Sequence, residues 1–251
     1  MNVSIHQIFY DDSQRASLDP AFAPYDNRAN DQPAWREYHV FRMEYLAGRC
    51  REGCITGYVS WKFGMKTRVP GSAFVAFIER HPGHDVYFLN PRGLERGSYR
   101  NVWLQGEFHH PGILGLARRI FREAGIDVDP ARLEQPRSQV LFCNYWAGTR
   151  RFWDAYVAFC EPVRHVLLHG LCEADRRLLH SRADKVIDAC FIPFIMERLF
   201  STLLTLRPDI SSRGWDGSGA RTPRTNAWYG RLFGLDRPWL AGPTAASRAR
   251  S

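Results

Sequence analysis

The stretch 54–68, CITGYVSWKFGMKTR, constrains the fold more than any other part of this sequence. Its apolar segment, ITGYV, is short and contains β-branched and aromatic residues, which predicts a buried strand. Three cations, Lys62, Lys66 and Arg68, follow directly. Ligands of open α/β sheets sit outside the carboxyl ends of the strands, so these cations are expected to meet an anion, in the first place a phosphate. The alternative is an ordinary core strand that ends in a solvated basic turn.

Length and composition fit one domain with a sizeable core. The chain has 251 residues, of which 45% are hydrophobic. No apolar run approaches the roughly 18 uncharged residues of a membrane span, and the N-terminus MNVSIHQIFYDD lacks the basic start and cleavage site of a signal peptide. We therefore expect a cytoplasmic protein. Its six cysteines form no CxxC pair, so reduced thiols are expected rather than a zinc site or a disulfide framework.

The net charge of +8 is concentrated at the C-terminus. Residues 207–251 contain eight Arg and three Asp, which gives +5, and they are rich in Gly, Ser and Pro. We expect an α/β domain at 1–206 and a partly disordered extension after it. The charge of this tail suggests peripheral association with a membrane, whereas no helix-turn-helix or RNA-recognition pattern supports nucleic-acid binding.

Alternating strand and helix patterns predict the fold class. Expected strands cover 3–10, 54–63, 86–89 and 139–147, and expected helices cover 33–47, 71–81, 112–124, a segment after 149 and a segment from 193 to 206. This order predicts an α/β fold of one domain, with helices on a mostly parallel sheet. Arg36 and Glu37 lie off the apolar face of the first helix, where solvated charges are expected.

Charged residues in apolar helices are further candidates for a site. Glu197 and Arg198 lie in the middle of VIDACFIPFIMERLFSTLLTL, the most apolar part of the chain. A buried charge costs several kcal/mol unless it is paired or used. The doublet is therefore either a structural ion-pair anchor or part of a site. Asp154 lies off the apolar face of its own helix, where the helix dipole alone accounts for an acid in the first turn.

Two histidine pairs invite a metal interpretation. His109 and His110 follow Glu107, and His165 and His169 are four residues apart on an expected helix. A metal site needs three or four converging ligands, and neither spacing identifies them. No HExxH motif frames either pair, so no metal site is predicted there.

The order of the motifs resembles that of a bacterial family of glycosyltransferase-like proteins that occur with capsule and O-antigen polysaccharide genes. The resemblance covers about residues 3–206 and rests on WREYHVF, GYVSWKF, DVYFLNP, FCNYWAG, FWDAYVAF and ERLFSTLL, in that order. In that family a central strand ends in a His-Tyr-Arg-Arg type motif, a later strand begins with Asp, and a late helix carries Glu-Arg-Leu. The matching positions here are Ser60, Trp61, Lys62 and Phe63, then Asp85, then Glu197 and Arg198.

The resemblance implies a nucleotide-sugar-dependent transferase of the GT-A type, an α/β sandwich around a mostly parallel sheet. This sequence departs from the family, because Lys62 stands where arginines are expected and no Asp-X-Asp metal motif follows a strand. We therefore favour a metal-independent enzyme, with manganese or magnesium left open. Lys62 and Lys66 would stabilise the departing diphosphate as point charges, assisted by Arg68 or Arg198.

An inverting transfer also needs a base for the acceptor hydroxyl. A carboxylate in an apolar helix has a reason to show a raised pKa, which suits proton abstraction. The predicted catalytic carboxylates are accordingly Glu197 and Asp85, and Asp154 is a third candidate.

The remaining predicted contacts lie near the ends of the expected strands or in the loop after the first of them. Tyr10, Asp26 and Asn27 follow the first strand or lie in the loop beyond it, where GT-A proteins hold the nucleotide, and they are assigned to the donor together with Ser60 and Trp61. Asn144, Tyr145 and Trp146 combine an amide, a hydroxyl and an indole, which hydrogen-bond to and stack on rings, and they are assigned to the acceptor.

The predicted function is transfer of a sugar from a nucleotide-sugar donor to a saccharide or lipid-linked saccharide acceptor in surface-polysaccharide synthesis. One alternative is a non-catalytic carbohydrate- or partner-binding module on the same fold. Another is a different phosphate-handling enzyme, such as a nucleotidyltransferase or a sulfotransferase, which the absence of a P-loop motif disfavours.

Overall fold

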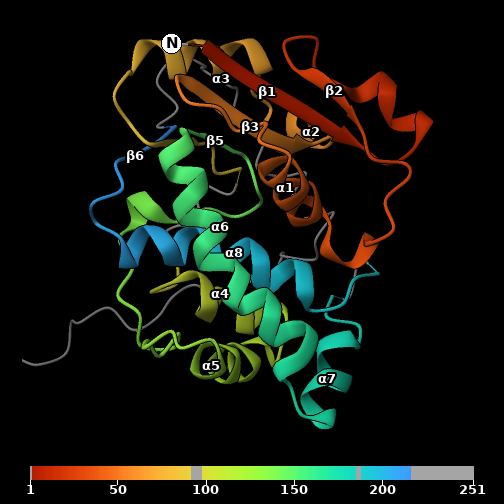
Figure 1. The fold of residues 1–251 in the computed structure, drawn as a ribbon, viewed down its shortest axis with the longest axis vertical. Coiled ribbons are helices and arrows are strands. Elements are labelled where there is room, and N and C mark those ends of the chain that lie inside the picture. Colours follow the sequence, from red (N-terminus) through yellow and green to blue (C-terminus); the bar gives the residue numbers. More distant parts are fainter. Residues whose placement is uncertain (1, 92–97, 185–187, 216–251) are drawn as a thin grey trace, which may run out of the picture. The chain divides into compact units, whose positions relative to one another are not determined.

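Two long parallel strands form the basis of the sheet. The structure is a computed structural model, and it describes residues 2–91, 98–184 and 188–215. β1 (Asn2–Phe9) and β3 (Cys54–Ser60) pair in parallel from Asn2 with Cys54 to Ile8 with Ser60 (Figure 1). On its other side, β1 pairs in parallel with β2 (Ala23–Asp26).

Within the described residues the sheet has six strands, in the order β2-β1-β3-β5-β4-β6. β5 (Trp146–Gly148) runs antiparallel to both β3 and β4 (Val86–Phe88). β4 pairs in parallel with β6 (Ser212–Gly214). The predicted α/β class with a mostly parallel sheet is thereby confirmed.

The strand expected at 139–147 is mostly irregular, which corrects the prediction. A short 3-10 turn, η4 (Arg137–Gln139), occupies its start, and pairing begins only at Trp146. Cys143 has a positive φ of 69°, a left-handed backbone conformation that no extended strand contains. The apolar run QVLFCNYWA therefore packs into the core largely without pairing.

Helices cover both faces of the sheet. The helices of the described residues are η1 (Asp12–Ser17), η2 (Pro33–Trp35), α1 (Glu37–Leu46), α2 (Phe63–Thr67), α3 (Gly71–Arg80), α4 (Val102–His109), α5 (Ile113–Glu123), α6 (Arg150–His165), η5 (Val166–Gly170), α7 (Glu173–His180) and α8 (Ile192–Leu206). Side chains alternate between faces along a strand, so Ile55 and Val59 of β3 pack with α3, whereas Tyr58 joins the cluster of α1, α6 and α8.

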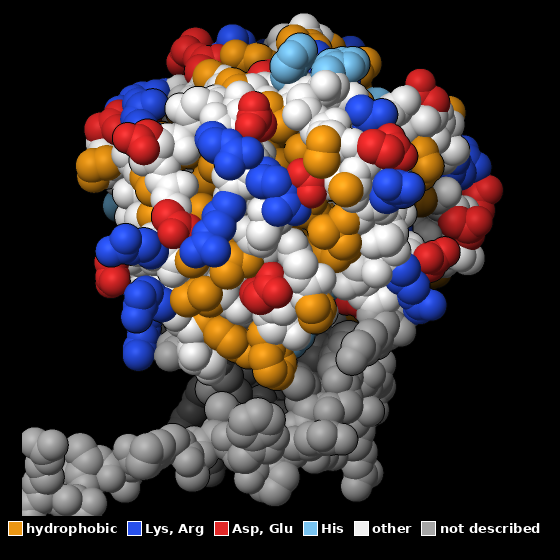
Figure 2. All heavy atoms as spheres, turned by 90° about the horizontal axis from the view of Figure 1, so that it is seen from below, with side chains coloured by type: hydrophobic (Ala, Val, Ile, Leu, Met, Phe, Trp, Pro, Cys, Tyr) orange, Lys and Arg blue, Asp and Glu red, His pale blue; other side chains and the backbone are white. Residues whose placement is uncertain are grey.

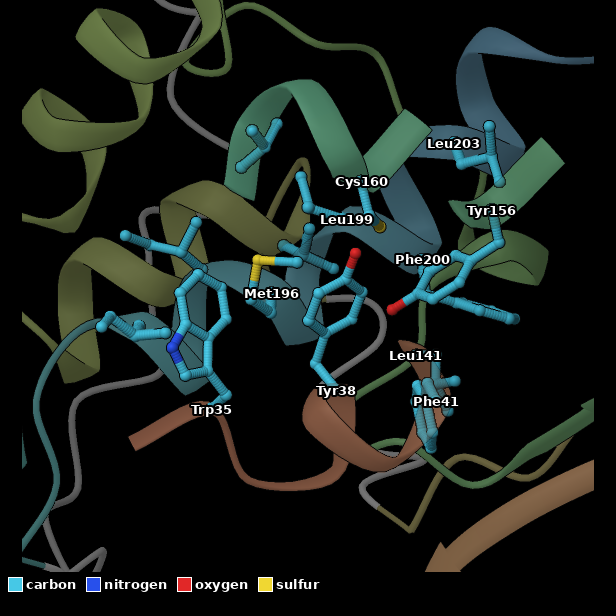
Figure 3. Packing of buried hydrophobic residues seen from close by; sticks show 14 of the residues in the cluster. Trp35, Tyr38, Phe41, Leu141, Tyr156, Cys160, Met196, Leu199, Phe200 and Leu203 are labelled. Atoms are coloured by element: carbon cyan, nitrogen blue, oxygen red, sulfur yellow. The ribbon is translucent and has the colours of Figure 1, made fainter. Parts of the chain in front are cut away.

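The larger cluster is strongly aromatic. Figure 3 shows Tyr38 and Phe41 of α1 beside Tyr156 of α6 and Phe200 of α8. Trp146 lies within this cluster, 1% exposed, with its ring centroid 4.5 Å from that of Trp153. The indole predicted to contact an acceptor sugar is therefore part of the core.

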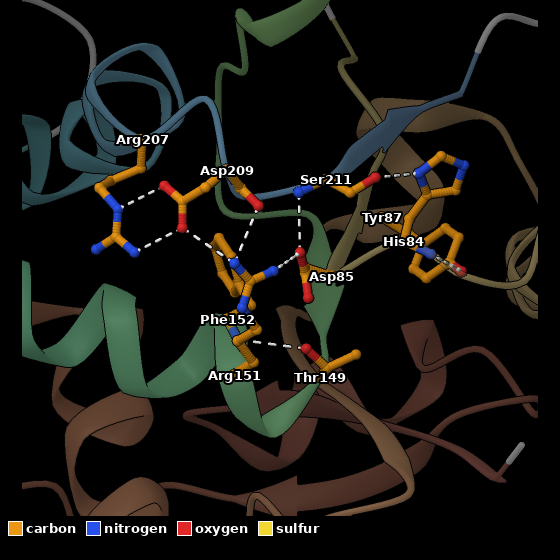
Figure 4. A network of polar contacts seen from close by, with 9 residues as sticks. All are labelled: His84, Asp85, Tyr87, Thr149, Arg151, Phe152, Arg207, Asp209 and Ser211. Carbon is orange, nitrogen blue, oxygen red and sulfur yellow. Dashed lines mark hydrogen bonds and ion pairs between the residues drawn. The ribbon is translucent and has the colours of Figure 1, made fainter.

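β6 extends the fold beyond residue 206, where the sequence analysis ended the domain. A polar network holds this segment (Figure 4): the Asp85 carboxylate accepts hydrogen bonds from the Ser211 backbone N–H, at 2.9 Å, and from Arg151. Arg151 also donates to the Asp209 carboxylate at 3.0 Å. Asp85 thus ties β6 to β4 and α6, a structural role in place of the predicted catalytic one.

Surface charge is mixed at the end of the molecule that carries α5 and α7. Figure 2 shows basic and acidic side chains interspersed over this face. Arg119 of α5 pairs with Asp175 of α7 at 2.6 Å. None of the described helices has both the length and the apolar character needed to cross a lipid bilayer. The predicted basic extension lies outside the described residues from 216 onward.

Candidate functional site

A cavity of about 320 Å³ lies beyond the carboxyl ends of β1 and β3. Its size is within the range of small-molecule sites. Eight of the residues predicted from sequence line it: Tyr10, Ser60, Trp61, Lys62, Lys66, Asn144, Tyr145 and Glu197. Sequence reasoning did not assign four further polar or nucleophilic lining residues: Gln14, Arg36, Glu37 and Cys143. The binding roles assigned to the eight stay predictions.

A fully buried glutamine positions the two strand ends. Gln7 Nε2 donates to the Trp61 carbonyl at 3.2 Å, and Gln7 Oε1 accepts from the Asp19 N–H at 2.6 Å. Helix α2 begins at Phe63, directly after Trp61 and Lys62. Because residues four apart share a helix face, Lys62 and Lys66 both reach the cavity.

Three cations surround the cavity, namely Lys62, Lys66 and Arg36. Burial lowers the pKa of Lys62, and the nearby charges of Lys66 and Arg36 lower it further. The pKa of Lys66 is raised, chiefly by Cys143, whose Sγ lies 3.3 Å from Lys66 Nζ. Like charges held this close favour occupation of the cavity by an anion.

Two carboxylates face these cations. Glu37 is the first residue of α1, and Glu197 lies in α8. Burial raises the pKa of Glu37, and the Glu197 carboxylate adds to the shift, against the opposing effect of Lys66. The preceding residue, Arg36, has φ 50° and ψ −133°, a conformation that costs on the order of 1–3 kcal/mol in a residue other than glycine. Both Arg36 and Glu37 line the cavity, which corrects the expectation of solvated charges.

The cavity also contains a buried polar atom without a hydrogen-bond partner among the described residues, Asn144 Oδ1. Asn27, predicted as a donor contact, does not line the cavity and interacts with the hydroxyl of Tyr10, which does. Because buried polar groups in native proteins are nearly always satisfied by protein groups or by water, Asn144 Oδ1 is available to a polar ligand or to water.

Three other predicted residues lie outside the cavity. Asp26 forms an exposed ion pair with Arg28 at 2.6 Å. Arg68 is exposed and ends α2 in a left-handed conformation. Asp154 accepts hydrogen bonds from Arg150 and Tyr45, each at 2.7 Å. Asp26 and Asp154 have local structural partners, which account for their charge without a ligand.

The structure separates the two members of the Glu197–Arg198 doublet. Successive helical residues point about 100° apart, so Glu197 lines the cavity while Arg198 points into the interface of α4 and α8. Arg198 is 2% exposed and donates to the carbonyls of Val102 and Phe194 and to Gln105 Oε1, at 2.8–2.9 Å. It anchors two helices, in place of the predicted contact with the donor.

His110 packs against the wall of the cavity. Its ring stacks on that of Phe194, a lining residue, with centroids 3.8 Å apart. Burial lowers the pKa of His110 from 6.5 to about 4, and Arg198 adds to the shift, against the effects of Asp184 and Glu197. No cluster of three His, Cys, Asp or Glu side chains suited to a metal ion occurs in the described part of the chain.

Stability is expected to depend on pH through His110. The folded state keeps the imidazole neutral, whereas the unfolded chain takes up a proton below about pH 6.5. The contribution of His110 to the free energy of unfolding is therefore complete above pH 6.5 and is lost as the pH falls towards 4. Allowing for solvent screening, the loss is about 2 kcal/mol. Urea unfolding near pH 7 and near pH 4.5 measures it, and His110→Gln should flatten the difference. An equal pH dependence in the variant would contradict this assignment.

Comparisons with protein-family models, curated proteins and solved structures gave no match to this chain. The chemistry of the cavity is therefore the basis for the function. Cations that face carboxylates, with aromatic and amide groups beside them, suit a ligand that carries both an anionic group and a neutral polar ring.

Proposed function

We propose that this chain is a nucleotide-sugar-dependent glycosyltransferase of the GT-A type, and that the donor diphosphate occupies the cavity. The observation that carries the proposal is the convergence of Arg36, Lys62 and Lys66 with two carboxylates beyond the carboxyl ends of β1 and β3. This edge is where open α/β sheets bind ligands.

The cations stabilise the leaving group. As the bond from the anomeric carbon to the diphosphate breaks, negative charge develops on the diphosphate oxygens. Lys62 and Lys66 act as point charges, and the guanidinium of Arg36 offers a planar fork of donors. Arg36 takes the assisting role that the sequence analysis gave to Arg68 or Arg198.

A carboxylate accepts the proton of the attacking hydroxyl. Glu197 and Glu37 both line the cavity, whereas Asp85 and Asp154 do not reach it. The raised pKa of Glu37 moves its titration towards neutral pH, where general bases are most effective. Asn144 and Tyr145 stay assigned to the saccharide or lipid-linked acceptor, at the same cavity.

We further propose that the three cations do the work for which other enzymes of this type use a divalent ion. Activity that persists in a strong chelator would support this, and activity lost to chelation and restored by manganese would overturn it. A role in surface-polysaccharide synthesis on the cytoplasmic side, with membrane association through residues 207–251, completes the proposal.

Binding of one nucleotide class is the expected result that tests the donor site. Among UDP-, GDP-, dTDP- and CMP-sugars, one class should raise the melting temperature, since a ligand at 100 times its Kd adds about 2.7 kcal/mol of stability. Lys62→Ala should abolish this shift, and Arg68→Ala, outside the cavity, should retain it. A shift that persists in Lys62→Ala would mean that the diphosphate binds elsewhere.

Turnover distinguishes an enzyme from a binding module on the same fold. Free nucleoside diphosphate released in the presence of saccharide acceptors reports transfer. A nucleotide-sugar that binds but is never turned over would contradict the enzyme proposal and favour the non-catalytic alternative.

A further inference from the structure

The cavity holds a cysteine for which the proposed transfer has no use. Cys143 is half-buried in the cavity wall, and its backbone adopts the left-handed conformation described above. Lys66 Nζ lies 3.3 Å from Cys143 Sγ. An ammonium at hydrogen-bond distance stabilises a thiolate, which is the reactive form of cysteine.

The surrounding charges reinforce this pair. Lys62 also interacts with Cys143, and the pKa of Lys66 is raised, first by Cys143 and also by Glu197 and Glu37, so that Lys66 is charged at neutral pH. Glu37 and Glu197 are the opposing charges, and each also interacts with Lys66. The buried Tyr145 hydroxyl is neutral, because burial raises its pKa. Among the residues that line the cavity, the cations Arg36, Lys62 and Lys66 outnumber the two carboxylates.

None of the other cysteines has an ammonium at hydrogen-bond distance among the described residues, as Cys143 has in Lys66. Burial raises the pKa of Cys50 to about 12 and also raises that of Cys160. Cys190 is half-buried and does not line this cavity. Cys54, also half-buried, lines a separate cavity in which Arg49 and Arg51 are matched by Glu44 and Glu52, and its Sγ contacts the Ile55 carbonyl. Cys172 is exposed and provides an internal reference, since reagents of any size reach it.

We propose that Cys143, paired with Lys66, is a modification site of this chain, at which small hydroperoxides and uncharged alkylating electrophiles react before they modify the other cysteines. With a hydroperoxide, the sulfur attacks one peroxide oxygen, and the S–O bond forms as the O–O bond breaks. The second oxygen leaves with the electron pair and takes up a proton. Sulfur is oxidised to a sulfenic acid, and the peroxide is reduced to water or an alcohol.

Competitive alkylation of the full chain tests the proposal. At about pH 6.5, limiting iodoacetamide should label Cys143 about five times faster than Cys172, because its larger thiolate fraction outweighs its lower intrinsic nucleophilicity. A maleimide attached to polyethylene glycol should favour Cys143 less than iodoacetamide does, because the polymer hinders approach to a sulfur that is half-buried in the cavity wall, whereas Cys172 is exposed. Peptide mass spectrometry gives both rates. Equal or slower labelling of Cys143 by iodoacetamide would overturn the proposal.

Variants at Lys66 test the cause of the reactivity. Lys66→Met should slow the labelling of Cys143 to the rate of Cys172 or below, and Lys66→Arg should restore most of it. A Cys143 rate unchanged in a folded Lys66→Met protein would exclude the pair as the cause. If Lys66→Met fails to fold, the relative labelling rates of Cys143 and Cys172 in the unmodified chain still test the proposal.

Peroxide treatment followed by dimedone locates the sulfenic acid. The adduct should appear on Cys143, and an adduct on Cys172 alone would overturn the proposal. None of these measurements depends on a nucleotide-sugar, so the site stands or fails independently of the transferase.

Discussion

Glu197→Gln or Glu37→Gln is expected to lower the rate of sugar transfer by about 10²–10⁴, the contribution of a positioned general base. Glutamine keeps the shape of glutamate but cannot accept the proton of the acceptor hydroxyl. Both side chains line the cavity, and the variant with the larger loss identifies the base. Binding of the donor should persist in either variant, because the cations that hold the diphosphate are unchanged.

The measurement separates chemistry from binding. Release of nucleoside diphosphate gives kcat, and the thermal shift with the donor reports binding. Asp154→Asn is the matched control: its carboxylate is engaged with Arg150 and Tyr45 outside the cavity, so turnover should be unchanged. If neither glutamine variant loses as much as about tenfold in kcat, the base lies elsewhere.

Arg198→Met is expected to lower the free energy of unfolding by about 3 kcal/mol. Methionine fills much of the same space, but the carbonyls of Val102 and Phe194 and the Gln105 amide oxygen would lose their charged donor. Buried acceptors left without partners account for the loss. Urea unfolding measures it, and Arg207→Met, which removes an exposed ion pair, should change stability far less.

Gly106 offers an independent check on this anchor. A Cβ at this position would lie 2.9 Å from Arg198 Cζ, too close for normal packing. Gly106→Ala should therefore destabilise the chain, and it should cost less in the Arg198→Met background, where the guanidinium is absent. Strictly additive losses would mean that the two residues do not compete for space.

Much of the fold could be predicted from local patterns. The β-branched and aromatic run at β3 and the helical spacing in α3, α5 and α6 depend on neighbours in the chain, and these elements lie near their expected positions. The segment before β5 was mispredicted, because apolar character indicates burial and does not by itself specify pairing. The left-handed Cys143 has no signature in the residues around it.

The candidate site was predicted in part, for the cations that follow β3 directly and for Glu197, Asn144 and Tyr145 by residue type. Lys62 and Lys66 reach the cavity because they come one turn apart after β3. Arg36 and Glu37 were expected in solvent, since nothing local reveals that η2 ends in a strained residue that places both at the cavity.

The sequence by itself determined the α/β class and the position of Lys62 and Lys66 at the end of the central strand, because periodicity and adjacency along the chain are local properties. Only the tertiary structure decided which charges meet. It placed Glu37, Glu197 and Cys143 around the same cavity and assigned Asp85 and Arg198 to structural contacts. The physical reason is that an electrostatic site depends on distances between segments far apart in the chain, which packing of the whole core sets.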